Sequence, residues 1–414
     1  MPQHILTLPE YAERFRCIGA ACEDTCCQGW AVPVDKNSFE KYQSLPPGRL
    51  QQLIDARIKQ GDNAQHQAAE HHASIELLPD GVCPFLSPDR LCMIQAEYGE
   101  SYLCRTCTVF PRSPRSIDGI TENPLTLSCP EAARLVLCDL NLLRPRKGIY
   151  QRKWDDTAHN QLPLRFYFWE IREAAIRLIR QRRFAFWERL FLLGIFARRL
   201  DAIARGELRR DVPGFLRDFA SATDSPQLRT SMRAIPSDPA MQLEMVVRLV
   251  NLRSSLGFLT PRMIECLEHF AGGIGSQPGI PMDSQIAAYQ TAFSRYYEPF
   301  FRKHPHMLEN YISNEIFRLA FPFGKSLFTG DSKAVPDIAK LYERMIIQFV
   351  LIKGLLIGNA AYHKRSFTTN HVVDVVQTAF RHFEHSPKFL TNAYELLAQR
   401  GLIHPQGLAI LVRN

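Results

Sequence analysis

The stretch that decides the front of the fold is CIGAACEDTCCQGW, residues 17–30. It carries four of the eleven cysteines of the chain: Cys17, Cys22, Cys26 and Cys27. Four more follow within the next eighty residues, at Cys83, Cys92, Cys104 and Cys107. The remaining three, Cys129, Cys138 and Cys266, are scattered. A chain in a reducing compartment keeps its thiols reduced, so such crowding favours metal or redox chemistry over disulfides.

The spacing of these eight cysteines suits a soft metal. The first group reads Cys-x4-Cys-x3-Cys-Cys and the second reads Cys-x8-Cys-x11-Cys-x2-Cys. Four thiolates hold zinc tetrahedrally, and four cysteines also hold an iron–sulfur cluster. We predict that all eight are candidate metal ligands, and we favour a 4Fe–4S cluster, with zinc as the alternative. A set of buried thiols without metal is the simpler interpretation.

Two details limit what such a centre does. Neighbouring side chains diverge, so Cys26 and Cys27 are not expected to serve one small ion together. One of them is then a ligand, and its neighbour is a ligand of a second site or a packed thiol. Cys22 and Cys26 fit the first two positions of a radical-initiating Cys-x3-Cys-x2-Cys loop, but the third falls at Gly29. We therefore expect a structural centre or a different arrangement.

Composition and charge narrow the class of protein. The 414 residues are 46% hydrophobic and 22% charged, which is typical of a folded soluble chain and excludes disordered and collagen-like classes. A net charge of +8 does not demand a nucleic-acid partner. Residues 1–15 contain no apolar signal-peptide core, and the most apolar run, 345–357, is interrupted by Gln348, Lys353 and Gly354. We predict a cytoplasmic protein that binds neither nucleic acid nor membrane.

Periodicity predicts a mainly α fold in two domains. Residues 1–150 are punctuated by Pro, Gly and Cys, with a strand–turn–strand pattern at 83–94 and a tight turn at 117–120. We predict a cysteine-rich N-terminal metal-binding domain with short hairpins over 1–150 and a large α-helical domain over 151–414. Helices of the second domain are expected at 241–256, 261–270, 284–303, 307–321, 336–357, 368–385 and 387–400.

Three other features have plain interpretations. His66, His71 and His72 lie in a polar stretch that is either a solvated surface or a metal site. The glycine-rich residues 271–276 follow a helix pattern instead of a strand, so we interpret them as a connector and not as a nucleotide loop. The arginines between 165 and 210 indicate a solvated helix face, or a docking surface for an acidic partner.

A later helix mixes polar and aromatic residues in an unusual way. Over residues 310–318, Asn310, Asn314 and Arg318 share one face, while Tyr311 and Glu315 share the adjoining face. Helices that only pack seldom carry so many polar groups beside an apolar stripe. The segment is either a hydrogen-bonded core between helices or part of a functional site.

Several stretches resemble the flagellin lysine-N-methylase family. They are Leu8–Tyr11, Phe15–Cys17, Cys22–Trp30, Cys83–Leu86, Leu91–Ile94 and Thr106–Arg112, with a further similarity at 310–323. The same cysteine pattern is similar to that of a broader class of zinc- or iron-chelating cysteine-cluster proteins.

The resemblance implies methyl transfer from S-adenosylmethionine to the ε-amines of surface lysines on flagellin. Within the family-like helix, Tyr311 and Glu315 are the candidate catalytic residues, and Asn310 and Asn314 are the candidate cofactor-binding residues. The alternative is an iron–sulfur redox protein, or a metal-cluster binding protein, without methyltransferase activity.

Overall fold

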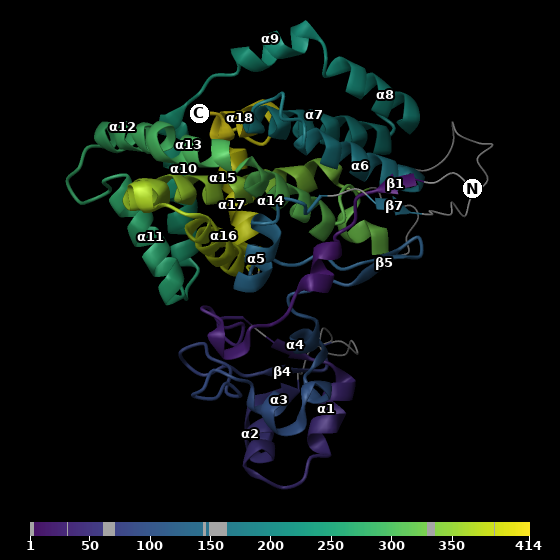
Figure 1. The fold of residues 1–414 in the computed structure, drawn as a ribbon, viewed down its shortest axis with the longest axis vertical. Coiled ribbons are helices and arrows are strands. Elements are labelled where there is room, and N and C mark those ends of the chain that lie inside the picture. The colour runs from purple at the N-terminus through teal and green to yellow at the C-terminus, as the bar shows by residue number, and fades with distance from the viewer. Residues whose placement is uncertain are drawn as a thin grey trace.

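A computed structural model describes residues 4–30, 32–60, 71–143, 146–148, 164–328, 336–384 and 386–414. A small lobe built from the front of the chain lies below a larger helical lobe (Figure 1). Helices make up most of the described chain, which confirms the mainly α prediction. The proposed role of the front domain in metal binding is a separate matter, taken up with the site.

Short elements surround a core of their own in the small lobe. Its three-stranded antiparallel sheet has the order β2-β4-β3, with bounds Val32–Val34, Ala73–Ile75 and Ile58–Gln60. Its helices are α1 Lys36–Gln43, α2 Arg49–Arg57, α3 Met93–Tyr98 and α4 Arg105–Val109. The predicted strand at 91–94 is wrong: after a single bridge from Leu86 to Cys92, the chain turns into α3.

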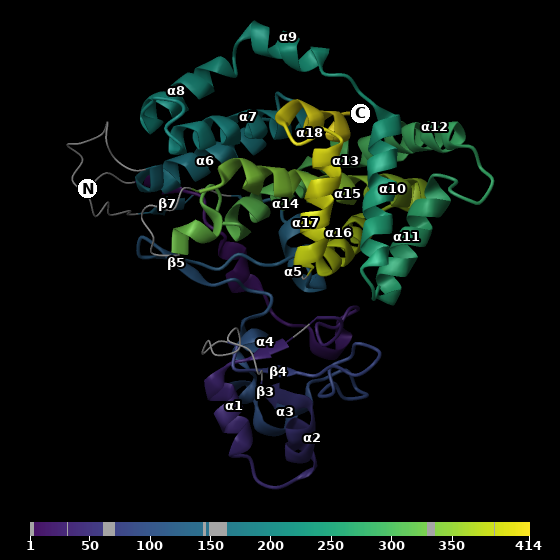
Figure 2. The ribbon, with the colours of Figure 1, turned by 180° about the vertical axis from the view of Figure 1, so that it is seen from behind.

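Helices pack around one another in the large lobe (Figures 1 and 2). In chain order they are α5 Pro130–Leu137, α6 Phe168–Ile179, α7 Phe186–Ala204, α8 Val212–Ala222, α9 Pro226–Ala234, α10 Pro239–Ser255, α11 Pro261–Gly273, α12 Met282–Ala292, α13 Glu298–Lys303, α14 Pro305–Arg318, α15 Ile338–His363, α16 Thr369–Glu384, α17 Pro387–Gln399 and α18 Pro405–Val412. A single turn of π-helix, Phe293–Tyr297, joins α12 to α13. Each helix predicted beyond residue 240 is present, with ends shifted by a few residues.

Sequence signals explain where several of these helices begin. Four of them start with a Ser, Thr or Asp that precedes a proline, and each of these side chains accepts a hydrogen bond from the backbone N–H three residues later: Ser225, Asp238, Thr260 and Ser386. The proline needs no N–H partner at the first helical position. Gly401 ends α17 with φ +66°, a conformation that favours glycine.

The longest helix, α15, runs through the middle of the large lobe and contacts α7, α10, α11 and α16 (Figure 2). Within the described residues one helical stretch, Ile338–Ser366, is long and apolar enough to cross a membrane, but 94% of its apolar window is buried inside the protein. Its apolar character is therefore accounted for by packing inside the protein. The cytoplasmic location stays a prediction.

Glycines let α11 lie directly against α15. A Cβ on Gly273 would stand 1.9 Å from the carbonyl oxygen of Gly358, and a Cβ on Gly358 would stand 2.5 Å from the ring of Phe270. The interpretation of 271–276 as a plain connector is thus wrong in its first half, because Gly272 and Gly273 form the last turn of α11. The absence of side chains there sets the distance between the two helices.

The two hydrophobic cores are not built from two consecutive parts of the chain. The buried core of the small lobe runs from Val32 to Cys104, whereas Tyr11–Phe15 and Leu125–Leu143 pack into the large core. The chain leaves the large lobe after Phe15 and returns at Arg112, whose guanidinium donates to the Phe15 carbonyl at 3.2 Å. The predicted boundary near residue 150 therefore does not coincide with the division between the cores.

A short hairpin and a separate pair of distant strands belong to the large lobe. Strands β5 Arg115–Ile117 and β6 Ile120–Glu122 pair through a turn in which Asp118 and Gly119 both have positive φ, which confirms the turn predicted at 117–120. Strand β1 His4–Leu6 pairs with β7 Arg146–Gly148. Glu122 on β6 is buried and binds the guanidinium of Arg172 from α6. The expectation of a solvated arginine face is wrong at Arg172, which is completely buried.

Candidate functional site

The cysteine loop, defined here as residues 17–30, lies at the junction of the two lobes (Figure 1). Helix α16 holds it through Arg381, which forms an ion pair with Asp24 and donates to the Gln28 carbonyl at 2.6 Å. Arg381 and Asp24 are each 7% exposed. The amide of Gln377, one turn earlier, donates to Asp24 at 2.8 Å and to the Ser128 carbonyl at 3.0 Å. The helical lobe therefore fixes the position of the loop.

A second segment of the small lobe lies against the end of this loop. Gly29 N–H donates to the Gly81 carbonyl and Cys83 N–H donates to the Cys27 carbonyl, each at 2.8 Å. Gly29 and Gly81 have φ values of +80° and +77°, and the Phe258 ring of the large lobe would lie 3.5 and 3.9 Å from a Cβ on each. These distances leave room for a Cβ, so it is the positive φ at both positions that favours glycine. The pairing brings Cys27 and Cys83 onto adjacent strands of chain.

All eleven cysteines are free thiols, and the vicinal pair faces two different neighbourhoods. Cys27 contributes to the raised pKa values of Cys83 and Cys92, and Cys27 and Cys26 both contribute to that of Cys107. The pKa of Cys26 is raised by a hydrogen bond with Cys27, by burial, and then by Cys129 and Cys17. That Cys26 and Cys27 serve different centres stays a prediction. Membership of Cys129 in this region was missed by the sequence analysis, which treated it as scattered.

Hydrogen bonds between thiols shift the pKa values in two pairs of cysteines, Cys26 with Cys27 and Cys104 with Cys107. A hydrogen bond from Cys26, aided by Thr25 and Arg381, lowers the pKa of Cys27 to about 7 although burial opposes the shift. A hydrogen bond from Cys107 likewise lowers the pKa of Cys104. Burial raises the pKa of Cys83 to about 12. A soft metal binds thiolates, and in each of these two pairs the hydrogen bond favours the thiolate of one partner.

The donor chemistry fits zinc or an iron–sulfur cluster, since the eight predicted cysteines supply soft ligands and no disulfide consumes them. Within the described ranges, however, no three His, Cys, Asp or Glu side chains already stand in the geometry of a bound metal. The metal centre therefore stays a prediction. Of the three histidines, His72 contacts Gln60 at 3.0 Å, and His66 lies outside the described residues.

The four candidate residues of α14 all lie inside the large lobe. Asn310 donates to the carbonyls of Val136 and Asp139 at 3.0 and 2.7 Å. Asn314 donates to the Leu125 carbonyl at 3.0 Å and accepts the Tyr11 hydroxyl. Both amides therefore tie α14 to the segment around α5. These contacts form a hydrogen-bonded core between α14 and its neighbours, which is one of the two interpretations of residues 310–318 given above.

Tyr311 and Glu315 differ in whether their polar atoms have hydrogen-bond partners. Both oxygens of Glu315 accept from Arg318 at 2.7 Å, and Arg318 also pairs with Glu384 at 2.8 Å. The Tyr311 hydroxyl is buried and has no hydrogen-bond partner among the described residues. Burial, then the charge of Glu315, raise the pKa of Tyr311 well above its usual value. An unsatisfied buried hydroxyl costs about 1–3 kcal/mol, so its presence calls for an explanation.

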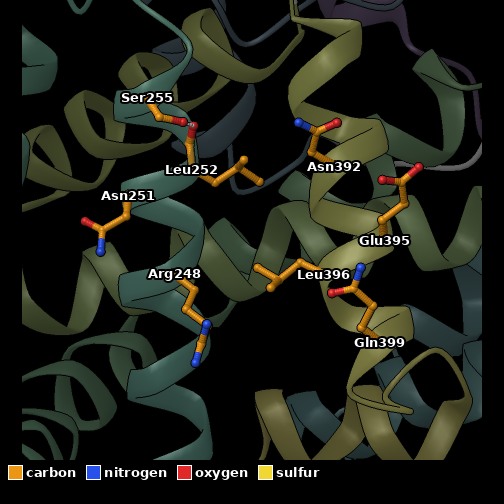
Figure 3. A pocket seen from close by; sticks show the side chains of 8 residues that line it. All are labelled: Arg248, Asn251, Leu252, Ser255, Asn392, Glu395, Leu396 and Gln399. Carbon is orange, nitrogen blue, oxygen red and sulfur yellow. Dashed lines mark hydrogen bonds between the residues drawn. The ribbon is translucent and has the colours of Figure 1, made fainter.

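A separate groove opens between α10 and α17, with a volume of about 540 Å³ (Figure 3). Leu252 and Leu396 point toward each other across its floor, and polar side chains stand along its rim: Arg248, Asn251, Ser255, Asn392, Glu395 and Gln399. It includes none of the sequence-predicted site residues. No sequence signal could have found it, because its residues belong to the ordinary outer faces of two helices.

Comparison with known proteins adds the decisive observation. A model of the FliB lysine N-methylase C-terminal domain matches residues 172–411, from within α6 to within α18. This chain belongs to the FliB lysine N-methylase family. The resemblance inferred from the cysteine loop and its neighbours is therefore confirmed.

Relatives of the FliB family extend the match to the small lobe. Proteins named Lysine-N-methylase from Salmonella typhimurium (strain LT2) and Salmonella choleraesuis (strain SC-B67) are 23% and 22% identical over 406 residues, which cover 95% of this chain and 95% of each relative. The flagellar biosynthetic protein FliU of Salmonella muenchen is 32% identical over 143 residues, 34% of this chain and 80% of that protein. No solved structure matches this chain.

Proposed function

We propose that this protein transfers methyl groups from S-adenosylmethionine to lysine side chains of flagellin. The observation that carries the proposal is the relationship over 406 residues with proteins named Lysine-N-methylase, because it includes both lobes. The relative named for flagellar biosynthesis supports flagellin as the substrate. S-adenosylmethionine is proposed as the donor because methyl transfer to an amine requires an activated methyl group.

The reaction sets clear requirements for the site. A lysine ammonium has no lone pair, so the amine must lose a proton before it attacks the methyl carbon. A pocket that excludes water lowers the pKa of the lysine and favours the neutral amine. The donor is a sulfonium cation, which aromatic faces and carboxylates stabilise. Holding donor and amine in line supplies a large part of the rate enhancement.

Tyr311 and Glu315 remain the proposed catalytic pair. The free hydroxyl of Tyr311 is a group that can contact a lysine amine, and the fixed carboxylate of Glu315 places negative charge beside it. Asn310 and Asn314 remain the proposed cofactor-binding residues, although in this structure their side-chain amides donate hydrogen bonds to backbone carbonyls. All four are buried, so catalysis at this position requires the surroundings of α14 to open.

We also propose a metal centre held by the cysteines of the small lobe and the cysteine loop, a 4Fe–4S cluster with zinc as the alternative. When bound, such a centre supplies folding free energy, on the order of 10 kcal/mol for structural zinc. The chain's own part is to position the loop through Arg381 and Gln377. Replacement of Cys22 and Cys26 with alanine should then give insoluble protein. A soluble, folded double variant would contradict this role.

The activity is tested by incubating the purified protein with S-adenosylmethionine and unmethylated flagellin and then measuring the mass of the flagellin by mass spectrometry. We expect mass increments of one methyl group. Tyr311→Phe combined with Glu315→Gln should abolish transfer without unfolding, whereas Tyr289→Phe, which changes another fully buried tyrosine, should leave it intact. Full activity in the double variant would remove the pair from the site.

The same experiment addresses the redox alternative. If flagellin gains no mass while the anaerobically purified protein shows a reducible visible chromophore, the protein is better described as an iron–sulfur redox protein. Metal analysis of that preparation distinguishes iron from zinc.

A further inference from the structure

Cys129 belongs to the large lobe, yet it lies at the junction where the cysteine loop docks. It occupies the position just before α5 and is 8% exposed. Its thiol therefore points into protein and not into solvent. The other two cysteines outside the predicted set lie away from the loop: Cys138 follows the opposite end of α5, and Cys266 lies in α11.

Two contacts fix the distance between this position and the loop. The Gln377 amide bridges the Asp24 carboxylate and the Ser128 carbonyl, so those two oxygens lie within about 6 Å of each other. From the other side, Arg134 of α5 donates to Glu23 at 2.5 Å. Residues 23–24 follow Cys22 directly, and Ser128 directly precedes Cys129. The backbone that carries Cys22 is thus held against the backbone that carries Cys129.

The electrostatic neighbours of each thiol agree with this placement. Burial, and after it the thiols of Cys22 and Cys17, raise the pKa of Cys129 to about 12. Cys17 likewise contributes to the raised pKa values of Cys22 and Cys26. No cysteine contributes to the pKa of Cys138 or to that of Cys266, a buried thiol elsewhere.

We propose that Cys129 joins Cys17, Cys22 and Cys26 in a four-thiol site for a thiophilic metal at the lobe junction. The thiols of the small lobe, Cys27, Cys83, Cys92, Cys104 and Cys107, form a second and separate set. The inference rests on the proposed metal centre and refines it, because it divides the predicted ligands between two centres and adds one from the helical lobe.

The division explains why two cysteines stand side by side in the loop. Consecutive side chains point in different directions. The electrostatic neighbours of Cys26 include Cys129 and Cys17, and those of Cys27 include Cys83 and Cys92. Cys26 is therefore assigned to the junction set and Cys27 to the small-lobe set. Cys17 and Cys26 are exposed on the loop, whereas Cys129 is fixed at the start of a helix. No three His, Cys, Asp or Glu side chains are preassembled among the described residues, so the loop thiols would have to approach Cys129 for all four to hold one metal ion. Each thiol releases its proton to solvent when its sulfur takes the metal.

Anaerobic titration of the full chain with Co²⁺ alone tests the assignment. Thiolate ligation to Co²⁺ gives charge-transfer absorption, and the proposal predicts two bound ions per chain. Cys129→Ser should lose one of the two ions together with its share of the band. Cys138→Ser and Cys266→Ser are matched controls and should still bind two.

Differential alkylation of the unaltered protein gives a second readout that does not depend on a variant folding. Because Cys129 is buried, N-ethylmaleimide is added at a urea concentration at which the metal-free chain opens enough for Cys129 to react. Read for each cysteine by mass spectrometry, the labelling should show that Co²⁺ protects Cys129 together with Cys17, Cys22 and Cys26. Protection of the loop cysteines without Cys129, or two bound ions in folded Cys129→Ser with an unchanged band, would overturn the inference while leaving a metal centre in place. Failure of the unaltered chain to bind Co²⁺ through thiolates would overturn the metal centre as well. The flagellin assay reports on methyl transfer separately.

Discussion

Lys353 is a charged residue in the interior of α15, and its replacement provides a sharp test of the packing described above. Its ammonium is 4% exposed, donates to the Val412 carbonyl at 2.7 Å and to the Asn414 side chain, and lies 5.5 Å from the centre of the Phe293 ring. Burial lowers its pKa from 10.5 to about 7. The folded protein therefore gives up this proton at a lower pH than the unfolded chain does.

The direction of the pH effect follows from that difference. Below about pH 7 both states hold the proton, and the folded state carries the full cost of the buried charge. Between pH 7 and 10.5 the unfolded state holds more protons, so stability rises with pH by up to about 1.4 kcal/mol per pH unit. Between pH 7 and pH 9 the gain is about 2 kcal/mol, which corresponds to about 3 °C in Tm for a chain of this length.

Lys353→Met removes this titration and keeps an apolar stem in the same space. We expect the Tm difference, variant minus unaltered protein, to fall by about 3 °C between pH 7 and pH 9 in scanning calorimetry. Using the difference cancels the cysteines and tyrosines that titrate in both proteins. Lys303→Met, at an exposed position, should show no such change. An equal difference for Lys353→Met at both pH values would refute the assignment of a buried, readily deprotonated lysine.

Two further substitutions probe the contacts that hold the lobes and helices. Gly273→Ala should destabilise the large lobe by about 1–3 kcal/mol or more, because its Cβ would overlap the Gly358 carbonyl. Gly48→Ala is the control, since a Cβ there has 3.8 Å to its nearest neighbour. Equal Tm values for the two variants would contradict the close approach of the helices. Arg381→Gln should cost about 3–5 kcal/mol by leaving Asp24 buried without its cation, and should speed alkylation of the cysteine loop. Partial recovery is expected for Arg381→Lys, while unchanged alkylation in both variants would argue against docking through this pair.

Local signals were sufficient to predict most helices of the large lobe. Capping residues followed by proline, such as Asp238-Pro239 and Thr260-Pro261, mark helix starts through contacts within one turn, so no knowledge of the fold is needed. The turn at Asp118-Gly119 is equally local. Contacts between distant segments were not predictable in this way: nothing near Gly273 in the sequence indicates that Gly358 lies against it.

The same distinction applies to the candidate site. The crowding of cysteines is visible in the sequence, and so is the family resemblance. The roles of Arg381 and Cys129 depend on how α16 and α5 meet the loop, across more than a hundred residues of chain, and no spacing rule encodes that. Arg172 is an example of a wrong prediction. It lies among other arginines on a helix, which favoured a solvent-exposed position, but it is buried against Glu122 from a hairpin fifty residues earlier in the chain.

The contact of Arg112 with the Phe15 carbonyl has a consequence for the architecture of the gene product. The polypeptide departs from the helical body and rejoins it at adjacent points, so the whole intervening stretch is topologically an insert on a double stem. A short peptide spanning that stem would leave the remaining helices connected in their native order. An exchange of this stretch between relatives therefore needs only two junctions in the chain, but it has to carry along matching partners for Arg381 and Gln377, which bind the stretch from the helical body.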